Sequence, residues 1–397
     1  MIQILDSTLR EGEQTPGVYF SPETKLAIAQ FLDQIGVDII EAGNPAIDKE
    51  IAASVTQISQ AGLKAKIGAH SRCRIDDVRK ALDCGVTFLG VFFGVSQQRL
   101  QQDYNISLEL AIKKIVEVIS YARNQNNNLL IRYTLEDTVR SSIENVVAAA
   151  IAAVEAGANI ISIADTTGYT TPFQPNRSIS YYVSTLKAEL AKRELYPQIE
   201  VHCHNDRGLA LANALDAYRA GADIIDVTVM GLGERSGIVD LAELLINLID
   251  ITENQSCWDL SFLKDLYELV SQHSYIAIPP HHPVIGKNAF THYAGVHVKA
   301  IAKDESLYQS VNPQILGRES SLALGMQSGC AAVEMALKQI GRGELIENKN
   351  LVFDILKEIK SIAKRGIPID IEKDLPAVVE RCTLSHLIRN WICGCTQ

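Results

Sequence analysis

Two histidines separated by one residue are the side chains in this sequence best placed to bind a metal ion. His202 and His204 close a β-branched run, and Glu11 follows another such run near the N-terminus. Along a strand, residues i and i+2 share a face, so both imidazoles would point toward one cation. Two histidines and a carboxylate, with positions left open for substrate, suit a divalent Lewis acid. The alternative is a hydrogen-bonded structural pair.

Other polar residues follow similar apolar runs at distant points of the chain. Arg10 stands beside Glu11, where a cation could stabilise an enolate oxygen or a carboxylate, or could simply form a salt bridge with Glu11 or Glu41. Further polar groups of this kind are His70, Arg132, Thr134, Glu136, Asp165 and Thr166. They can meet only if the runs are strands whose carboxyl ends gather at one place.

Eight short apolar runs alternate with longer amphipathic stretches. The runs are Ile2–Leu5, Val37–Glu41, Ala65–Gly68, Phe88–Phe93, Leu129–Tyr133, Ile160–Ala164, Ile199–His202 and Ile224–Thr228. Continuous apolar strands that alternate with helices predict parallel strands buried on both faces. Eight such units close most naturally into a (β/α)₈ TIM barrel, whose active site lies at the carboxyl ends of the strands. An open doubly wound sheet is disfavoured because no glycine-rich dinucleotide loop follows the first run.

The alternation stops after about residue 252, although residues 253–275 keep a helical pattern. A proline-rich segment at 279–283 then interrupts any helix. Helical patterns return around 322–341 and 350–364 and in a last stretch to residue 392. The sequence therefore predicts an α/β protein with a barrel domain over 1–275 and a smaller, mostly helical region over 276–397.

Composition narrows the classes of function. The net charge of −10 disfavours a partner made of nucleic acid or anionic membrane. No apolar stretch reaches the roughly 18 residues of a membrane span, and no signal peptide precedes the first run. The eight scattered cysteines indicate reduced thiols and a cytoplasmic protein. Cys393 and Cys395 lie close together, but two thiols alone make a poor metal site.

Four ordered motifs resemble the DRE-TIM metallolyase superfamily, in its homocitrate synthase and isopropylmalate synthase branch. They are DSTLREGEQ at 6–14, HCHNDRGLALAN at 202–213, GLGER at 231–235 and FTHYAGVH at 290–297. The resemblance runs from about residue 2 to residue 330. It implies a Claisen condensation of acetyl-CoA with a 2-oxo acid, followed by hydrolysis of the thioester. It also implies that Mg²⁺, Mn²⁺ or Zn²⁺ assists the reaction.

The resemblance also implies roles for single residues. Glu11, His202 and His204 would bind the metal, and Arg10 would support the developing alkoxide. A histidine of the last motif would be the base or its partner, with His292 favoured over His297. Glu136 would belong to the same proton network. For the histidine, the alternative is a residue that caps a helix. For Glu136, the alternative is a solvated carboxylate.

Several positions resemble homocitrate synthases more than isopropylmalate synthases. Arg132, His70 and Thr134 could bind a second carboxylate of the acceptor, which needs a cation and donors to replace its water. Thr166 is expected to add a hydroxyl to the substrate site. These residues favour 2-oxoglutarate, with homocitrate as the product. Gly90 departs from the pattern, since lysine-pathway homocitrate synthases have Asp there. Loss of that side chain could enlarge or neutralise part of the pocket and admit a different or bulkier 2-oxo acid.

Other activities remain as alternatives. A different 2-oxo acid would make the protein an isopropylmalate, citramalate or benzylmalate synthase. A barrel lyase such as hydroxymethylglutaryl-CoA lyase is disfavoured because such lyases lack the motif at 290–297. A non-catalytic scaffold is disfavoured because Arg10, Glu11, His202 and His204 are all present.

The proline-rich hinge and the resemblance together predict a homodimer. In it, region 276–397 of one chain would cover the barrel mouth of the other and exclude water from the enolate. The alternative is a region that packs on its own barrel.

Overall fold

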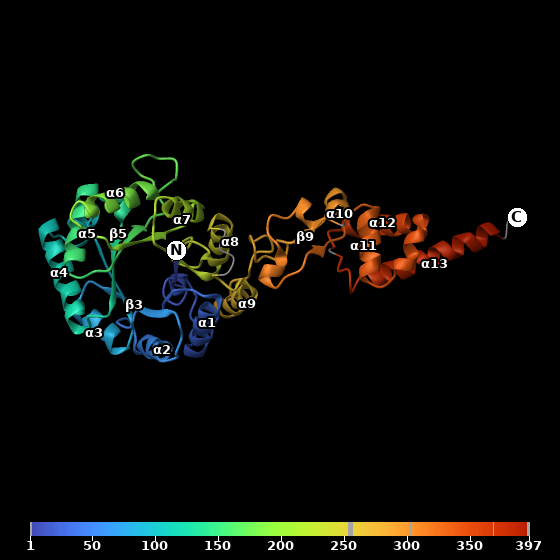
Figure 1. The fold of residues 1–397 in the computed structure, drawn as a ribbon. Helices are drawn as coiled ribbons and strands as arrows, with labels where there is room; N and C mark the ends of the chain where they lie inside the picture. The colour runs from blue at the N-terminus through green and yellow to red at the C-terminus, as the bar shows by residue number, and fades with distance from the viewer. Residues whose placement is uncertain (1, 253–256, 302, 368, 395–397) are drawn as a thin grey trace. The chain divides into compact units, whose positions relative to one another are not determined.

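The computed structural model describes residues 2–252, 257–301, 303–367 and 369–394, and it divides the chain into two compact units (Figure 1). The first unit is Met1–Ile278 and the second is Pro279–Gln397. Residues 253–256, the first part of the helix predicted over 253–275, lie outside the described residues. Cys395 and the side chain of Cys393 also lie outside them. Within the described ranges, the six remaining cysteines are free thiols, and no helix combines the length and apolarity that a membrane span needs.

The first unit is a closed barrel of eight parallel strands in sequence order, with β1 paired to β8. The strands are β1 Gln3–Asp6, β2 Ile39–Glu41, β3 Lys66–Arg72, β4 Phe88–Gly94, β5 Leu130–Glu136, β6 Ile160–Asp165, β7 Gln198–Cys203 and β8 Ile224–Val227. All eight predicted runs are observed as strands, and the TIM barrel is confirmed. A buried apolar cluster fills part of the barrel interior and consists of Leu5, Ile39, Phe88, Ile160 and Ile224.

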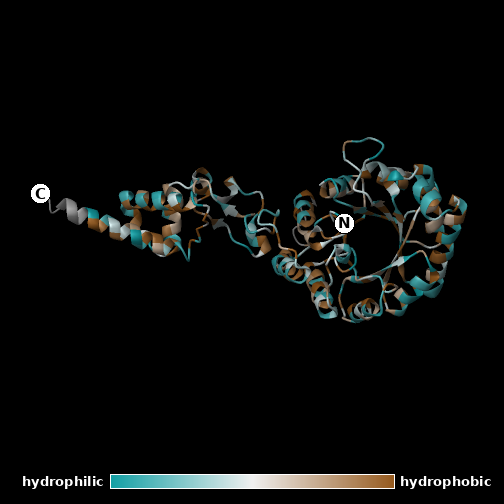
Figure 2. Cartoon of the chain, turned by 180° about the vertical axis from the view of Figure 1, so that it is seen from behind, coloured by the Kyte–Doolittle hydropathy of each residue, from teal (hydrophilic) through white to brown (hydrophobic). Residues whose placement is uncertain are grey.

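Helices surround the barrel, one layer outside the strands (Figure 1). They are α1 Pro22–Ile35, α2 Lys49–Ser59, α3 Ile75–Asp83, α4 Leu108–Gln125, α5 Ile143–Glu155, α6 Ile179–Ala191, α7 Ala210–Arg219, α8 Leu241–Thr252 and α9 Leu263–Ser274. Figure 2 shows hydrophilic and hydrophobic residues together on the helices around the barrel, as expected of amphipathic helices that cover a core with one face. Ser21 caps the N-terminus of α1, since its side chain accepts a hydrogen bond from the amide of Thr24.

Strand register places the predicted polar residues at matching heights. His70 pairs with Gly90, and Gly90 pairs with Arg132. Two residues further along, Phe92 of β4 pairs with Thr134 of β5. Inward-facing residues of neighbouring strands form layers in a barrel. These strands therefore present two successive layers of side chains near their carboxyl ends.

The second unit contains a small two-stranded parallel sheet and four α-helices among its described residues. Its elements are β9 Thr291–His292, α10 Gly295–Ile301, β10 Ser321–Leu322, α11 Cys330–Gln339, α12 Lys349–Ala363 and α13 Leu375–Gly394. The predicted helix over 322–341 was placed too early, because Leu322 pairs with His292 in the sheet. Gly325 and Gly329 follow it, and glycine disfavours helix. An apolar core lies between α11, α12 and α13.

Candidate active site

A polar cavity of about 330 Å³ lies at the carboxyl ends of the barrel strands. Its lining includes nine residues singled out by their sequence positions: Arg10, Glu11, His70, Arg132, Thr134, Glu136, Thr166, His202 and His204. The barrel thus brings together side chains from β1, β3, β5, β6 and β7 or from the loops that follow them.

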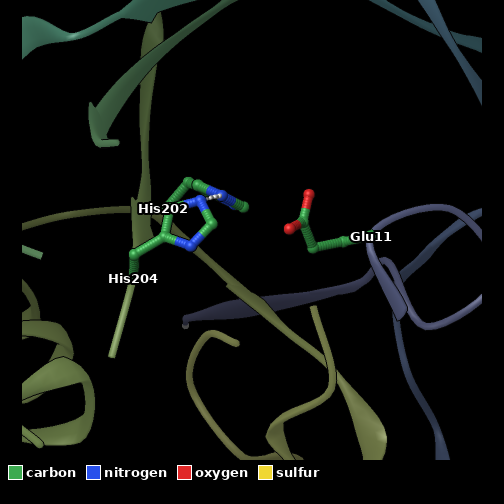
Figure 3. Close-up of side chains that lie close together, drawn as sticks. All are labelled: Glu11, His202 and His204. Atoms are coloured by element: carbon green, nitrogen blue, oxygen red, sulfur yellow. Dashed lines mark hydrogen bonds between the residues drawn. The ribbon is translucent and has the colours of Figure 1, made fainter. Parts of the chain in front are cut away.

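Three of these residues form a group that fits a metal ion. The Nε2 atoms of His202 and His204 lie 3.2 Å apart. One ligand atom from each histidine and one carboxylate oxygen of Glu11 all lie within 4.8 Å of one another. Figure 3 shows the Glu11 carboxylate turned toward the two imidazoles. All three side chains are buried, where two imidazoles and a carboxylate are a suitable donor set for a divalent cation.

Asp226 on β8 orients one of these ligands. Its Oδ2 atom lies 2.6 Å from Nδ1 of His202, and its Oδ1 accepts a 2.6 Å hydrogen bond from Ser7. Burial lowers the pKa of His202, but the Asp226 and Glu11 carboxylates together outweigh burial, so this pKa is raised overall. A proton held on Nδ1 leaves the Nε2 lone pair free, which is the tautomer that a metal ligand requires.

Arg10 forms both ion pairs that the sequence allowed. Its Nε donates to Oε2 of Glu41 at 2.6 Å, and its Nη1 contacts the Glu11 carboxylate. Burial raises the pKa of Glu11, but Arg10 and the two histidines outweigh burial and lower it to about 2. Glu11 is therefore ionised at neutral pH, as a metal ligand must be.

Arg132 lies almost fully buried at the base of the cavity. Its Nη2 donates to Oε1 of Glu41 at 2.5 Å, and its Nη1 donates to Oε1 of Glu200 at 2.9 Å. His70 Nδ1 is 3.1 Å from Arg132 Nη2, and its ring stacks on Phe92. Nε of Arg132 has no hydrogen-bond partner within the described part of the chain. Arg132 and His70 are therefore adjacent, as the sequence predicted.

Gly90 makes room for this ion-pair network. A Cβ atom at residue 90 would lie 2.6 Å from Nη2 of Arg132 and 3.0 Å from Oε1 of Glu41. The missing side chain therefore does not leave an enlarged pocket at this height. The Arg132–Glu41 pair occupies the space.

Three polar groups in the next layer keep free hydrogen-bonding capacity. Thr134 Oγ1 and Glu200 Oε2 are buried, and neither has a partner among the residues that the structure describes. Burial raises the pKa of Glu200 to about 7, although Arg132 opposes the shift. Thr166 Oγ1 accepts a 2.8 Å hydrogen bond from the amide of Asp137 and can still donate its own proton.

Glu136 is held by two residues that the sequence reasoning missed. Arg99 in η2 (Arg99–Asp103) donates from Nη2 to Oε1 of Glu136 at 2.6 Å, and the Tyr104 hydroxyl donates to Oε2 at 3.2 Å. Burial raises the pKa of Glu136, against the opposing effects of Arg99 and Tyr104. The segment after β4 carries no motif, so nothing in the sequence indicated this contact.

The two candidate subdomain histidines belong to the second unit. His292 lies on β9, half-buried, with Nε2 3.0 Å from the side-chain nitrogen of Gln309. His297 on α10 is exposed, and its ring stacks on Tyr308 at a centroid distance of 4.0 Å. The two rings thus have different surroundings within one motif.

The closed parallel barrel and the polar cavity at its carboxyl end define a TIM-barrel enzyme. Residues 1–270 match the HMGL-like family, and residues 284–366 match the homocitrate synthase post-HMGL domain-like family. The chain belongs to the HMGL-like family, in the branch of homocitrate and isopropylmalate synthases.

Named relatives span most of the chain. A homocitrate synthase of Pyrococcus abyssi is 39% identical over 90% of this chain and 94% of its own length. The homocitrate synthase AksA of Methanocaldococcus jannaschii is 36% identical over 92% and 87%. A 2-isopropylmalate synthase of the same organism is 34% identical over 96% and 71%.

The fold also matches solved structures. An HMG-CoA lyase from Bacillus subtilis has a TM-score of 0.59 at 23% identity, and the match covers 70% of this chain and 95% of the lyase. At this identity the likeness shows the fold alone.

Proposed function

We propose that the protein condenses acetyl-CoA with 2-oxoglutarate and that water then hydrolyses the thioester, which gives homocitrate and CoA. The observation that carries the proposal is the adjacency of two groups in one cavity. One is the cluster of Glu11, His202 and His204, and the other is the set of donors that Arg132 and His70 offer to an acceptor's distal carboxylate. The relatives named homocitrate synthase support this acceptor.

Glu11, His202 and His204 would hold the divalent cation, whether Mg²⁺, Mn²⁺ or Zn²⁺. Such a cation would bind the 2-oxo acid and polarise its keto group. Arg10, which is buried beside Glu11, would support the negative charge that develops on the keto oxygen. Removing an α-proton from acetyl-CoA is the task proposed for His292, with Glu136 in the same proton network.

The acceptor's distal carboxylate would bind to Arg132, His70 and Thr134, with a further hydroxyl from Thr166. Thr134 Oγ1 and Arg132 Nε supply donors that have no partner among the described residues. With a pKa of about 7, Glu200 is partly neutral near pH 7. Burial raises the pKa of Glu41, but Arg10 and Arg132 outweigh burial and lower it, so Glu41 remains an ionised partner of Arg132. A substrate carboxylate would therefore bind to the free Arg132 Nε and Thr134 hydroxyl donors.

An apolar acceptor such as 2-oxoisovalerate would leave these buried donors unsatisfied, at a cost of about 1–3 kcal/mol each. This disfavours the isopropylmalate and benzylmalate alternatives. Pyruvate, the acceptor in citramalate synthesis, has no distal carboxylate and would leave the same donors unsatisfied. The match of residues 284–366 to a homocitrate synthase domain disfavours a lyase.

We further infer a cytoplasmic homodimer in which region 276–397 of one chain covers the barrel mouth of its partner. The catalytic domain would then be residues 1–275. An enolate must be protected from water, and the barrel cavity lies at an open end of the strands. A base on the second unit can act only if that unit reaches a barrel mouth.

The test of the reaction class is release of free thiol from acetyl-CoA by the purified protein with 2-oxoglutarate present. Thiol release should require both substrates and should stop when a chelator removes the metal. Re-addition of one divalent cation should restore it. Undiminished turnover in a sample that metal analysis shows to be metal-free would exclude the metal-assisted mechanism.

A further inference from the structure

Two arginines meet on one tyrosine in the loops at the carboxyl end of the barrel. Arg177 and Tyr169 lie in the segment between β6 and α6, and Arg207 follows β7. The guanidinium carbons of Arg177 and Arg207 lie 4.2 and 4.6 Å from the centre of the Tyr169 ring. Arg177 Nη1 also donates to the Tyr169 hydroxyl at 2.6 Å. The ring therefore holds both cations close together.

Hydrogen bonds connect the loops that carry this pair to the rim of the catalytic cavity. Arg235 lines the cavity, and its Nε donates to Asp206, the residue before Arg207, at 2.7 Å. A second nitrogen of Arg235 donates to the carbonyl oxygen of Thr166 at 2.7 Å. Arg235 thus ties the loop after β6 to the loop after β7. The two arginines lie just outside the site where the acceptor would bind.

Charge compensation distinguishes this pair from the arginines that line the cavity. Each of those is paired with a carboxylate: Arg10 with Glu41, Arg99 with Glu136, Arg132 with Glu200, and Arg235 with Asp206. Across the described ranges of the chain, the structure gives neither Arg177 nor Arg207 an ion pair with a carboxylate. Both positive charges are available to an external anion.

Phosphate is the anion that such a pair fits best. Guanidinium groups bind phosphate oxygens through paired N–H donors, and their charge persists at any physiological pH. The proposed thioester substrate carries phosphates only on its nucleotide end. Its acetyl group must enter the cavity while that nucleotide stays outside.

We propose that Arg177 and Arg207 bind the phosphate groups of the acyl-CoA, with Tyr169 positioning both guanidinium groups. This inference rests on the proposed function. It assigns the donor's nucleotide to the rim over β6 and β7 and leaves the interior of the cavity to the acceptor and the acetyl group.

The test compares two thioesters on the double variant Arg177→Ala, Arg207→Ala. The KM for acetyl-CoA should rise at least about tenfold, whereas the KM for the 2-oxo acid should stay within about twofold. Acetyl-pantetheine lacks the nucleotide, so its kcat/KM should be unchanged, which also shows that the variant is folded. Arg177→Lys with Arg207→Lys should recover part of the affinity because the charges remain.

Arg219→Ala is the matched control, since it removes one arginine charge at the far end of α7, where Arg219 is paired with Asp216 at 2.7 Å. It should leave both KM values unchanged. An unchanged KM for acetyl-CoA in the double variant would overturn the inference, as would an equal loss with acetyl-pantetheine. Calorimetric titration with CoA tests the proposed phosphate site even if the wild-type protein transfers no acetyl group. Weaker binding to the double variant supports the site, and equal binding refutes it.

Discussion

Asp226 Oδ2 lies 2.6 Å from Nδ1 of His202, on the opposite side of the ring from the Nε2 that faces His204. A carboxylate in this position fixes the ring orientation and makes the ligating nitrogen more basic. Ser7 fixes the carboxylate in turn. The candidate metal site is thus supported by residues of β8 and of the segment after β1.

Asp226→Asn should weaken metal binding by about 10- to 100-fold, because the amide neither fixes the same tautomer nor adds negative charge. A metal titration followed by calorimetry measures the change. Ser7→Ala serves as the control, since it removes only the outer contact and should have a smaller effect. Equal affinities in wild type and Asp226→Asn would show that Asp226 does not support the metal.

Arg99→Ala should lower kcat and change its pH dependence. Burial raises the pKa of Glu136 and Arg99 opposes this, so loss of Arg99 raises the pKa further. If Glu136 acts as a carboxylate, the acidic limb of the kcat/KM profile moves to higher pH. Asp103→Asn removes a carboxylate that raises the pKa of Glu136, so it should move the limb the other way, to lower pH. If the acidic limb of the kcat/KM profile does not move in Arg99→Ala, Glu136 does not take part in the proton network.

The pH dependence of stability should reveal Glu200. Burial raises its pKa from 4.5 to about 7, so the folded protein keeps a proton that the unfolded chain has lost. The contribution of Glu200 to the free energy of unfolding therefore falls as pH rises through this window. Glu200→Gln removes that dependence, so its stability relative to wild type should improve from about pH 5 to about pH 8.

Urea denaturation at both pH values measures the difference, and Glu117→Gln on the exposed face of α4 is the control. The same stability difference at both pH values would mean that Glu200 titrates normally.

A shared active site predicts complementation between inactive chains. Glu11→Ala lacks a proposed metal ligand, and His292→Ala lacks the proposed base. Mixed dimers would contain one intact site, so thiol release should reappear after subunit exchange. If the mixture stays inactive although exchange is demonstrated, or if an active monomer is isolated, the second unit does not complete its partner's site.

Much of the fold could be predicted because buried parallel strands are short, apolar on both faces and separated by helices. The residues at which the strands end were harder to predict. Strand β3 was predicted to stop at Gly68 but continues to Arg72, and β5 was predicted to stop at Tyr133 but continues to Glu136. The added residues include His70, Thr134 and Glu136, whose polar side chains line the cavity. Polar residues at a strand end look like loop residues in a sequence.

The candidate site was predictable where a local spacing carries the information. His202 and His204 are such a case, because the period of a strand puts both on one face. The partners were not predictable, since Glu41, Glu200 and Asp226 reach Arg132 and His202 only through the closure of the barrel. Nor could the sequence show that the ion pair of Arg132 with Glu41 occupies the space left by Gly90.

The most direct test of the central claim is the kcat/KM for thiol release from acetyl-CoA with a panel of acceptors. The panel contains 2-oxoglutarate, 2-oxoisovalerate, pyruvate and phenylpyruvate. We expect 2-oxoglutarate to be preferred in the wild type. We also expect Arg132→Ala to reduce that preference by roughly 3 kcal/mol or more, because the distal carboxylate loses its cation. Comparing acceptors within one variant cancels any loss of folded protein. If another acceptor leads in the wild type, or if Arg132→Ala leaves the order unchanged, the protein does not select 2-oxoglutarate through Arg132.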